Sequence, residues 1–217
     1  MEINECDQLR LPSTVCQPDV RTRQRLVEDQ YEAIVHFKLN ETVPIDVVTH
    51  FETAKNLYLY AWFVYRFYPV AEQQALASLE FALRERFPDF VKEQVGQRGF
   101  GLKKLMNHAI DNHHIRNEEF STRELWAWRR AEMRHSVAKV EEMMAAGIES
   151  IEWNNSEVVV TQEDLDCDWL DIFQEVIPKI RNRYAHGSGE LKPAALHTFE
   201  MTVELINQLY PNSRRSG

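Results

Sequence analysis

The sequence predicts an all-α protein built around a helical bundle. Only 7 glycines and 8 prolines occur among 217 residues, and leucine, alanine, glutamate and arginine, which favour helices, are plentiful. Apolar side chains recur at three- and four-residue steps in several segments, which is the pattern of amphipathic helices. Because 44% of the residues are hydrophobic, the chain can bury a core without disulfides or a metal. We therefore expect five or six helices packed against one another.

The first 44 residues are predicted to form an irregular arm. Pro12 and Pro18 interrupt this region, and proline is poorly tolerated inside helices and sheets. Residues 31–39 alternate in part between apolar and polar side chains. Both a short strand and a poor helix fit that stretch.

Prolines bound the first two helices of the predicted bundle. After Pro44, apolar residues from Val47 to Tyr65 follow a helical stripe. Pro69 stops this helix or opens the next one, which spans 71–87 and ends at Pro88.

A glycine-containing loop separates these helices from the next two. The loop covers residues 96–101, and a third helix fits residues 102–115. Ser121 and Glu124 have the spacing of a capping box, in which the two side chains bond backbone amides reciprocally. This box predicts the start of a long helix that ends near Gly147.

The fifth predicted helix follows a loop with an extended piece at residues 148–160. Thr161 and Asp164 form a second capping pattern at its start. The apolar pattern continues beyond Pro178, so we expect a kink there, and the helix to end at Gly187.

One more helix is predicted at residues 193–210, before Pro211. The helical domain is therefore expected to cover 45–211, between the arm at 1–44 and a flexible tail at 212–217.

The formal net charge of −9 is concentrated in one region. Nine acidic residues and no lysine or arginine lie between Glu149 and Glu175, so the rest of the chain is neutral overall. This acidic run is either a solvated loop and helix start or a docking surface for a basic partner. The balance argues against broad coating of nucleic acid but leaves room for a small cationic site.

The cysteines and the N-terminus predict a cytoplasmic protein. Cys6, Cys16 and Cys167 form neither a disulfide framework nor a zinc motif, which indicates a reducing compartment. The N-terminus is polar and acidic, unlike a secretory signal. The most apolar stretch, Leu57–Tyr65, is far shorter than the ~20 residues that span a bilayer. We expect no membrane partner.

The segment from Arg181 to His186 contains the side chains best suited to binding a phosphate and transferring a proton. The arginine fork suits a phosphate, Asn182 offers a donor and an acceptor, and histidine exchanges a proton near neutral pH. On an ideal helix Asn182 and His186 share a face, whereas Arg181 lies about 140° from His186. The arginine must reach around, the last turn must deviate, or another chain must complete the site.

Arg181-Asn182-x-x-x-His186, followed by Gly187, resembles the Rx4-6H motif of HEPN domains (higher eukaryote and prokaryote nucleotide-binding). A softer resemblance is the acid and base one turn apart at Glu80 and Arg84. Together they cover about residues 45–210. The resemblance implies a bundle, often dimeric, in which two motifs face one cleft.

The resemblance also implies a function. Many HEPN proteins are metal-independent endoribonucleases of toxin–antitoxin, abortive-infection or phage-defence systems, and others are catalytically silent modules that bind a protein or a nucleotide. The nuclease would use no cofactor and no metal. Its partners would be RNA, a second copy and an antitoxin or other protein.

Roles follow for individual residues from the same resemblance. Arg181 would hold the scissile phosphate, Asn182 would orient the histidine or the phosphate, and His186 would act as general base or acid. Arg183 and Tyr184 would steer or stack on RNA. Glu80 and Arg84 would give structural support to the motif arginine.

Structural alternatives exist for each of these features. The structural interpretation pairs Arg181 with an acid such as Glu80 and makes His186 a helix cap, and it treats Glu80–Arg84 as an ordinary i,i+4 pair. Three further groups have a functional and a structural interpretation. They are the histidines His108, His113 and His114 (metal or helix end), the aromatic run Trp62, Phe63, Tyr65, Phe67 and Tyr68 (base stacking, core or dimer face), and the arginines Arg123, Arg129, Arg130 and Arg134 (phosphate stripe or solvated face).

Overall fold

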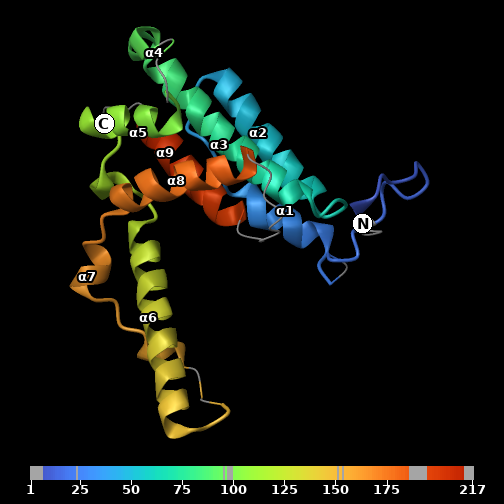
Figure 1. Ribbon diagram of the computed structural model, residues 1–217, viewed down its shortest axis with the longest axis vertical. Helices are drawn as coiled ribbons and strands as arrows, with labels where there is room; N and C mark the ends of the chain where they lie inside the picture. Colours follow the sequence, from blue (N-terminus) through green and yellow to red (C-terminus); the bar gives the residue numbers. More distant parts are fainter. Residues whose placement is uncertain are drawn as a thin grey trace. The chain divides into compact units, whose positions relative to one another are not determined.

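The computed structural model describes residues 7–22, 24–94, 96, 100–150, 152, 154–185 and 195–212. Across these residues the secondary structure is helical, with nine α-helices and no strand (Figure 1). The all-α prediction is confirmed. The described helices exceed five or six for three reasons. Helix α1 forms where a strand and a helix were both open, α4 forms where we expected no helix, and the predicted fifth helix is divided in two. None of the described helices is both long and apolar enough to cross a membrane.

The α-helices follow one another in chain order with these bounds: α1 Val27–Val35, α2 Ile45–Tyr60, α3 Phe67–Arg86, α4 Pro88–Gln94, α5 Leu102–Asp111, α6 Arg123–Ala146, α7 Gln162–Leu165, α8 Trp169–Ala185 and α9 Ala195–Leu209. Two short 3-10 helices, Asn117–Glu119 and Asn155–Glu157, lie in the connections.

The chain divides into two compact units. The first contains the residues up to Ile115 and those from Phe173 onward, and the second contains Arg116–Ile172. The boundaries predicted at residues 44/45 and 211/212 stay a prediction.

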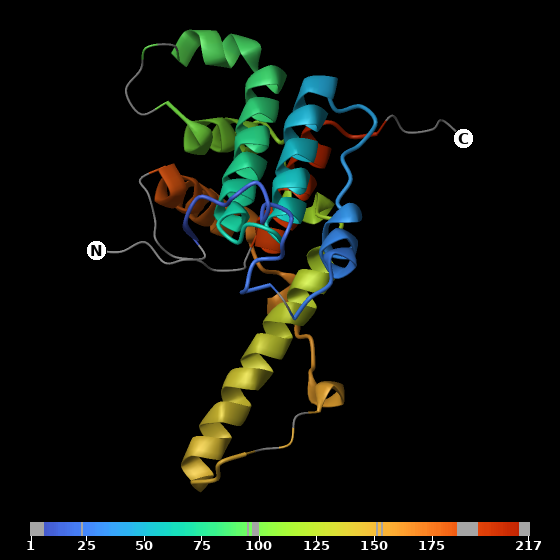
Figure 2. The same cartoon turned by 90° about the vertical axis from the view of Figure 1, so that its right-hand side faces the viewer.

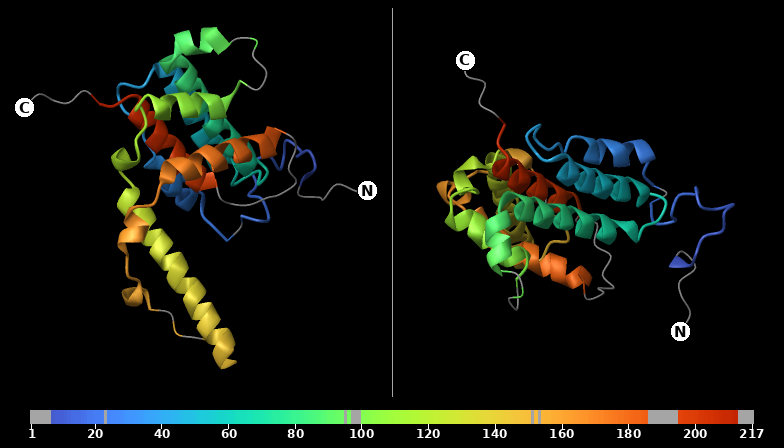
Figure 3. Two further views of the ribbon diagram at one scale, coloured as in Figure 1. Left: turned by 60° about the vertical axis from the view of Figure 1, so that its left-hand side comes forward. Right: turned by 90° about the horizontal axis from the view of Figure 1, so that it is seen from above.

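The core of the first unit is formed by α2, α3 and α9, which lie side by side (Figure 3). Phe199 of α9 is fully buried, and its ring meets those of Phe51 and Tyr58 of α2 edge-on, at centroid distances of 5.7 and 5.9 Å. Ala71 and Ala75 of α3 belong to the same cluster. Edge-to-face contacts between large rings contribute beyond the area they bury, so they hold the last helix against helices far away in sequence.

Residues 31–35, the first part of the stretch that allowed a strand or a helix, belong to α1. This helix packs on α2, and the buried side chain of Gln30 forms hydrogen bonds with residues of α2 and α3. Its amide nitrogen donates to the Tyr58 carbonyl at 2.8 Å, and its amide oxygen accepts from the Tyr68 hydroxyl at 3.0 Å. Tertiary packing therefore decides an ambiguous local pattern in favour of a helix.

The arm before α1 is anchored by Asp19, whose side chain is completely buried. Its carboxylate accepts hydrogen bonds from the backbone N–H and the guanidinium of Arg21, and from the backbone N–H of Tyr65 at 3.2 Å. Burial opposes ionisation, but these bonds outweigh it and lower the pKa of Asp19 to about 2. The arm is thus tied to the turn between α2 and α3.

Pro88 ends α3, as predicted, and also opens α4. Proline suits the first position of a helix because the N–H that it lacks has no partner there.

In the second unit, the long helix α6 ends as the sequence predicts. Gly147 has φ +65°, and its N–H donates to the Met144 carbonyl, while the Ile148 N–H donates to the Met143 carbonyl. This pair of bonds is a Schellman motif, which favours glycine. The capping box expected at Ser121 is absent. The N-cap residue is Thr122, which makes no side-chain cap bond, so Glu124 is one position too early to complete a box.

The predicted fifth helix is two helices, α7 and α8, separated at residues 166–168. The side chain of Asn117 accepts from the Trp169 N–H at 2.9 Å and donates to the Cys167 carbonyl at 3.0 Å. The Asp168 carboxylate accepts from the N–H groups of Leu170 and Asp171. These bonds make a new helix start, because they occupy backbone groups that a continuous helix would need.

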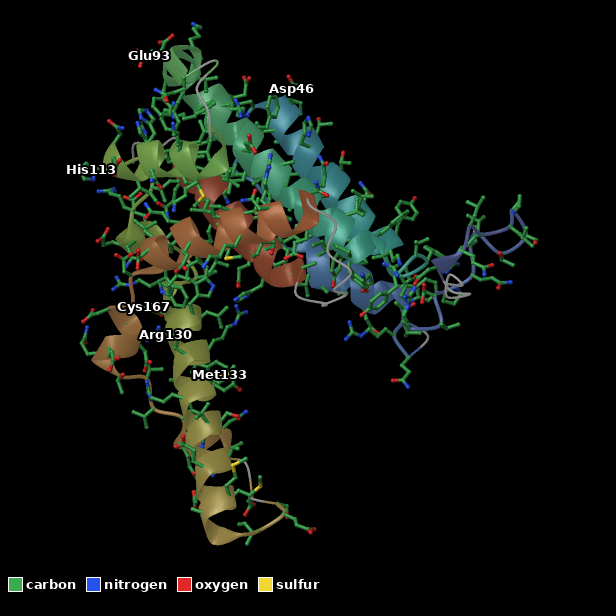
Figure 4. The ribbon with its side chains drawn as sticks, viewed as in Figure 1. Asp46, Glu93, His113, Arg130, Met133 and Cys167 are labelled. Carbon is green, nitrogen blue, oxygen red and sulfur yellow. The ribbon has the colours of Figure 1, made fainter. Side chains whose placement is uncertain are left out.

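The arginines of α6 hold the segment that returns beside it (Figure 2). Arg134 donates to both oxygens of the buried Asp164 at 2.6 and 2.8 Å, and Arg123 donates to the Leu165 carbonyl at 2.6 Å. Arg130 lies beside Cys167, to whose sulfur it donates at 3.2 Å (Figure 4). These three side chains therefore bond the returning segment, while between 30% and 48% of each stays exposed.

We predict that Asp19→Asn lowers the free energy of unfolding by about 2 kcal/mol near neutral pH, because asparagine cannot supply the charge that Arg21 pairs with. The folded-state pKa is depressed from 3.8 to about 2. The carboxylate's contribution is therefore complete above pH 3.8 and is lost as the pH falls through about 2. Urea unfolding at several pH values measures both effects.

The control is Asp89→Asn, which removes the same charge from an exposed side chain paired with Lys92. That substitution should change the stability by no more than about 0.5 kcal/mol. Equal losses in the two variants would contradict the anchoring role of Asp19.

Candidate functional site

A pocket of about 370 Å³ in the first unit collects residues from α3, α8 and the start of α5. Its lining residues are Glu80, Arg84, Phe100, Gly101, Leu102, Lys103, Pro178, Arg181 and Asn182. The pocket thus joins the two segments that carry the sequence resemblance, although about 100 residues separate them in the chain.

Glu80 is the centre of this pocket. One carboxylate oxygen accepts a hydrogen bond from Arg84 Nη2 at 2.7 Å, and the other lies 3.6 Å from Arg181 Nη2. The first contact joins two residues one turn apart on α3, and the second joins α3 to α8. A single carboxylate therefore positions two guanidinium groups from different helices.

Arg181 stays accessible while it is paired. Its side chain is 44% exposed, whereas that of Glu80 is 16% exposed. The distance of 3.6 Å is longer than a good hydrogen bond, so the contact is chiefly charge attraction, which is modest at an exposed position. The guanidinium consequently keeps donors available for a ligand.

Further groups complete the pocket. The Arg84 guanidinium lies over the Phe100 ring, 5.1 Å from its centroid, in a cation–π contact. Lys103 is exposed in the first turn of α5. The N-cap of α5 is Gly101, so no side chain caps its first amides. The positive end of the helix dipole adds to the cationic side chains.

The local charge is opposite to that of the whole chain. The lining contains three cationic side chains and one carboxylate, while the chain carries −9. Planar guanidinium groups, an ammonium group and the amide of Asn182 are the groups that bind phosphate oxygens in proteins. The pocket can therefore hold a phosphate group by charge and by directed hydrogen bonds.

The structure brings together four of the residues selected from the sequence: Glu80, Arg84, Arg181 and Asn182. The Glu80–Arg181 pair, which we offered as a structural alternative, is present, as is the i,i+4 pair with Arg84. Both contacts are equally those that a supporting role for Glu80 and Arg84 requires.

The remaining predicted site residues cannot be placed in the pocket. Arg183 and Tyr184 belong to α8, but their side chains lie outside the described part of the structure, and His186 lies outside the described residues. Sequence reasoning missed Phe100 and Lys103. The signal for Lys103 was a lysine in the first turn of a predicted helix, two residues after the glycine that precedes it.

The histidines of α5 and the following turn pack against aromatic rings. His108 stacks on Phe90 with a centroid distance of 3.8 Å, and His114 meets Phe87 edge-on at 5.0 Å. Burial lowers the pKa of His114, as do the charges of Arg86 and His108. Among the described residues, no group of three histidine, cysteine or acidic side chains is arranged to hold a metal ion.

The residues of the predicted aromatic run lie in two places, the core of the first unit and the turn after α2. Tyr68 is buried in the core of the first unit, and Tyr65 and Phe67 pack against that core. Trp62 and Phe63 lie in the turn after α2, where their rings meet edge-on at 4.9 Å. The core interpretation therefore holds for the second half of the run.

Comparison of the chain with protein-family models, curated proteins and solved structures finds no match. The resemblance to HEPN domains stays a prediction that rests on the residues named above.

We predict that Glu80→Gln strengthens the binding of inorganic phosphate by about threefold, because it removes one negative charge about 5 Å from the ligand. Titration calorimetry at low ionic strength measures the change. The control is Glu85→Gln, which removes the same charge from an exposed position of α3 outside the pocket. Equal affinities in the two variants would show that phosphate does not bind beside Glu80.

Proposed function

We propose that the protein is a metal-independent endoribonuclease of HEPN type that acts in toxin–antitoxin or phage-defence systems. The observation that carries the proposal is the position of Arg181. It is held by Glu80 at the rim of a cationic pocket and remains exposed. This is the arrangement expected of an arginine that binds a scissile phosphate.

The pocket supports charge stabilisation during cleavage. In the transition state, negative charge grows on the non-bridging oxygens of the phosphate. Arg84 is already oriented by its hydrogen bond to Glu80, and Arg181 is attracted to the same carboxylate, so less reorganisation is needed when that charge develops. Lys103 and Asn182 supply further donors at the same pocket.

Proton transfer is assigned to His186 by the sequence motif alone. The proposed step removes the proton of the ribose 2′-hydroxyl, whose oxygen then attacks the neighbouring phosphorus. The bond to the 5′-oxygen breaks, and that oxygen takes up a proton as it leaves. The products are a 2′,3′-cyclic phosphate and a 5′-hydroxyl, and DNA is spared because it lacks the attacking group.

The proposal includes partners. RNA is the substrate, a second copy of the chain completes a cleft between two motifs, and an antitoxin or other protein restrains the activity. The neutral charge outside the acidic run favours contact with a few phosphates over coating of a long RNA.

A second candidate is a catalytically silent module that binds a nucleotide or a protein. The observation that favours it is the same Glu80–Arg181 pair, because a carboxylate beside the arginine offsets part of the charge offered to a phosphate. The two candidates differ in turnover, whereas both include binding of a phosphate.

We predict that the purified protein cleaves single-stranded RNA in the presence of EDTA and leaves DNA of the same sequence intact. His186→Ala should slow cleavage about 10²–10⁴-fold, because it removes the group that transfers the proton. Arg181→Ala should slow it about 10²-fold or more, because it removes a charge that faces the transition state. Single-turnover kinetics and mass analysis of the product ends provide the measurements.

The matched control is Lys179→Ala, which removes a positive charge from the same helix at a position paired with Glu175 and outside the pocket. Its rate should equal that of the unchanged protein, and circular dichroism should show the same helix content in all variants. No cleavage by the unchanged protein, or equal cleavage by His186→Ala, would reject the nuclease. Salt-sensitive RNA binding without cleavage would favour the silent module.

A further inference from the structure

A stripe of exposed apolar side chains runs along the second half of α6. We call it the α6 stripe, and it consists of Met133, Val137, Val140 and Met144. Each of these residues is between 43% and 73% exposed. Met133 lies one turn beyond Arg130, on the part of α6 that extends toward its C-terminal end (Figure 4). Exposed apolar residues at scattered positions are ordinary, but four on one face of a helix are not.

The spacing of the stripe is that of a coiled-coil seam. Its members are separated by four, three and four residues, which places them within an arc of about 60° on a helix. This is the d-a-d-a order of a heptad, with Val137 and Met144 as a residues. From Met133 to Met144 the seam is about 16 Å long and contains four layers of side chains.

In the first half of α6 the second unit covers the same face as the stripe, since Trp126 is buried beside Phe120 and Trp169. In the second half of α6 the covered face is a different one. Ala131 is buried, Arg134 bonds Asp164, and His135 lies near Glu157 at 3.8 Å. These residues lie about 90° or more around the helix from the centre of the stripe. The returning segment therefore leaves the stripe uncovered.

We propose that the α6 stripe binds the same stripe of a second copy of the chain, with the two helices antiparallel. In this arrangement Met133 faces the Met144 position of the other copy. Val137 likewise faces the Val140 position. The two central valine layers are then flanked by methionine layers, whose flexible side chains fill irregular gaps.

Charge selects the antiparallel direction. A parallel pair would place the two Arg130 side chains opposite each other in the seam and Arg129 of one helix beside Arg134 of the other. The antiparallel pair instead places Arg134 of one copy on the same flank as Glu141 of the other. Arg134 is already fixed beside the stripe by Asp164 and the Val159 carbonyl, so it needs little ordering to meet that carboxylate.

The seam is short, so the dimer is expected to form at micromolar concentrations and above. It uses no residue of the pocket around Glu80, and it does not depend on the proposed nuclease activity. A dimer that the double variant below leaves intact would reject this seam and leave the proposed function untouched. A monomer at all concentrations would reject the seam and also the second copy that the proposed function includes.

Sedimentation velocity of the full chain over about 1–500 μM should show a monomer–dimer equilibrium. The double variant Met133→Glu and Met144→Glu should weaken association about 100-fold, because the outer layers would bury carboxylates. Glu141→Arg should weaken it about threefold by placing like charges together. The control Ala145→Glu adds a carboxylate at an exposed position on another face of α6 and should leave association unchanged.

The direction of the helices is tested by mixing the single variants Val137→Cys and Val140→Cys under mild oxidation. Mass spectrometry of the linked peptides identifies which cysteines pair, so the native cysteines do not interfere. Links between positions 137 and 140 should exceed links between two copies of position 137. A monomer at all concentrations, a dimer that the double variant leaves intact, or dominant 137–137 links would overturn the proposal.

Discussion

The packing of Phe199 against α2 is the interaction on which the first unit depends. This residue brings the last helix of the chain into contact with rings that are almost 150 residues earlier. Because α9 also packs on α3, the aromatic contacts fix one side of α3 in the core. Residues on another side of α3, such as Glu80 and Arg84, are then held by a rigid element. A helix without that support would not position two guanidinium groups with one carboxylate.

The net charge of this protein does not describe the charge at its individual sites. Three basic residues and one acid line the pocket of an acidic chain. In the second unit, the acidic run supplies Asp164, whose carboxylate is buried and bonded to Arg134. The hydrogen bonds from Arg134 lower the pKa of Asp164 to about 2, with further bonds from Thr161 acting in the same direction. Part of the run is therefore an internal partner of α6, and net charge alone does not reveal this.

The two surfaces that we interpret functionally differ in their chemistry. The pocket around Glu80 is polar and suited to a phosphate, whereas the α6 stripe is apolar and follows a heptad. They lie in different units of the chain. A protein with both would combine recognition of a small charged group with self-association through an independent helix, and substitutions in one need not affect the other.

Several elements were predictable from local sequence because local chemistry decides them. The C-terminal end of α6 follows from Gly147, which adopts a positive φ without a steric cost, and the end of α3 follows from Pro88. The i,i+4 pair of Glu80 and Arg84 follows from helical spacing. The absent capping box at Ser121 shows the limit of such patterns, since a shift of one residue in the helix start removes its geometry.

The sequence by itself determined the helical class, the ends of α3 and α6, and the candidate residues Arg181 and Glu80, because periodicity, glycine and proline act over a few residues. Only the tertiary structure decided that these two residues meet, that Lys103 and Phe100 join them, and that Asn117 divides the predicted fifth helix. The same holds for the arginines of α6, which bond the segment beside them. These outcomes depend on contacts between distant parts of the chain, whose free energy is set by packing and burial rather than by local spacing.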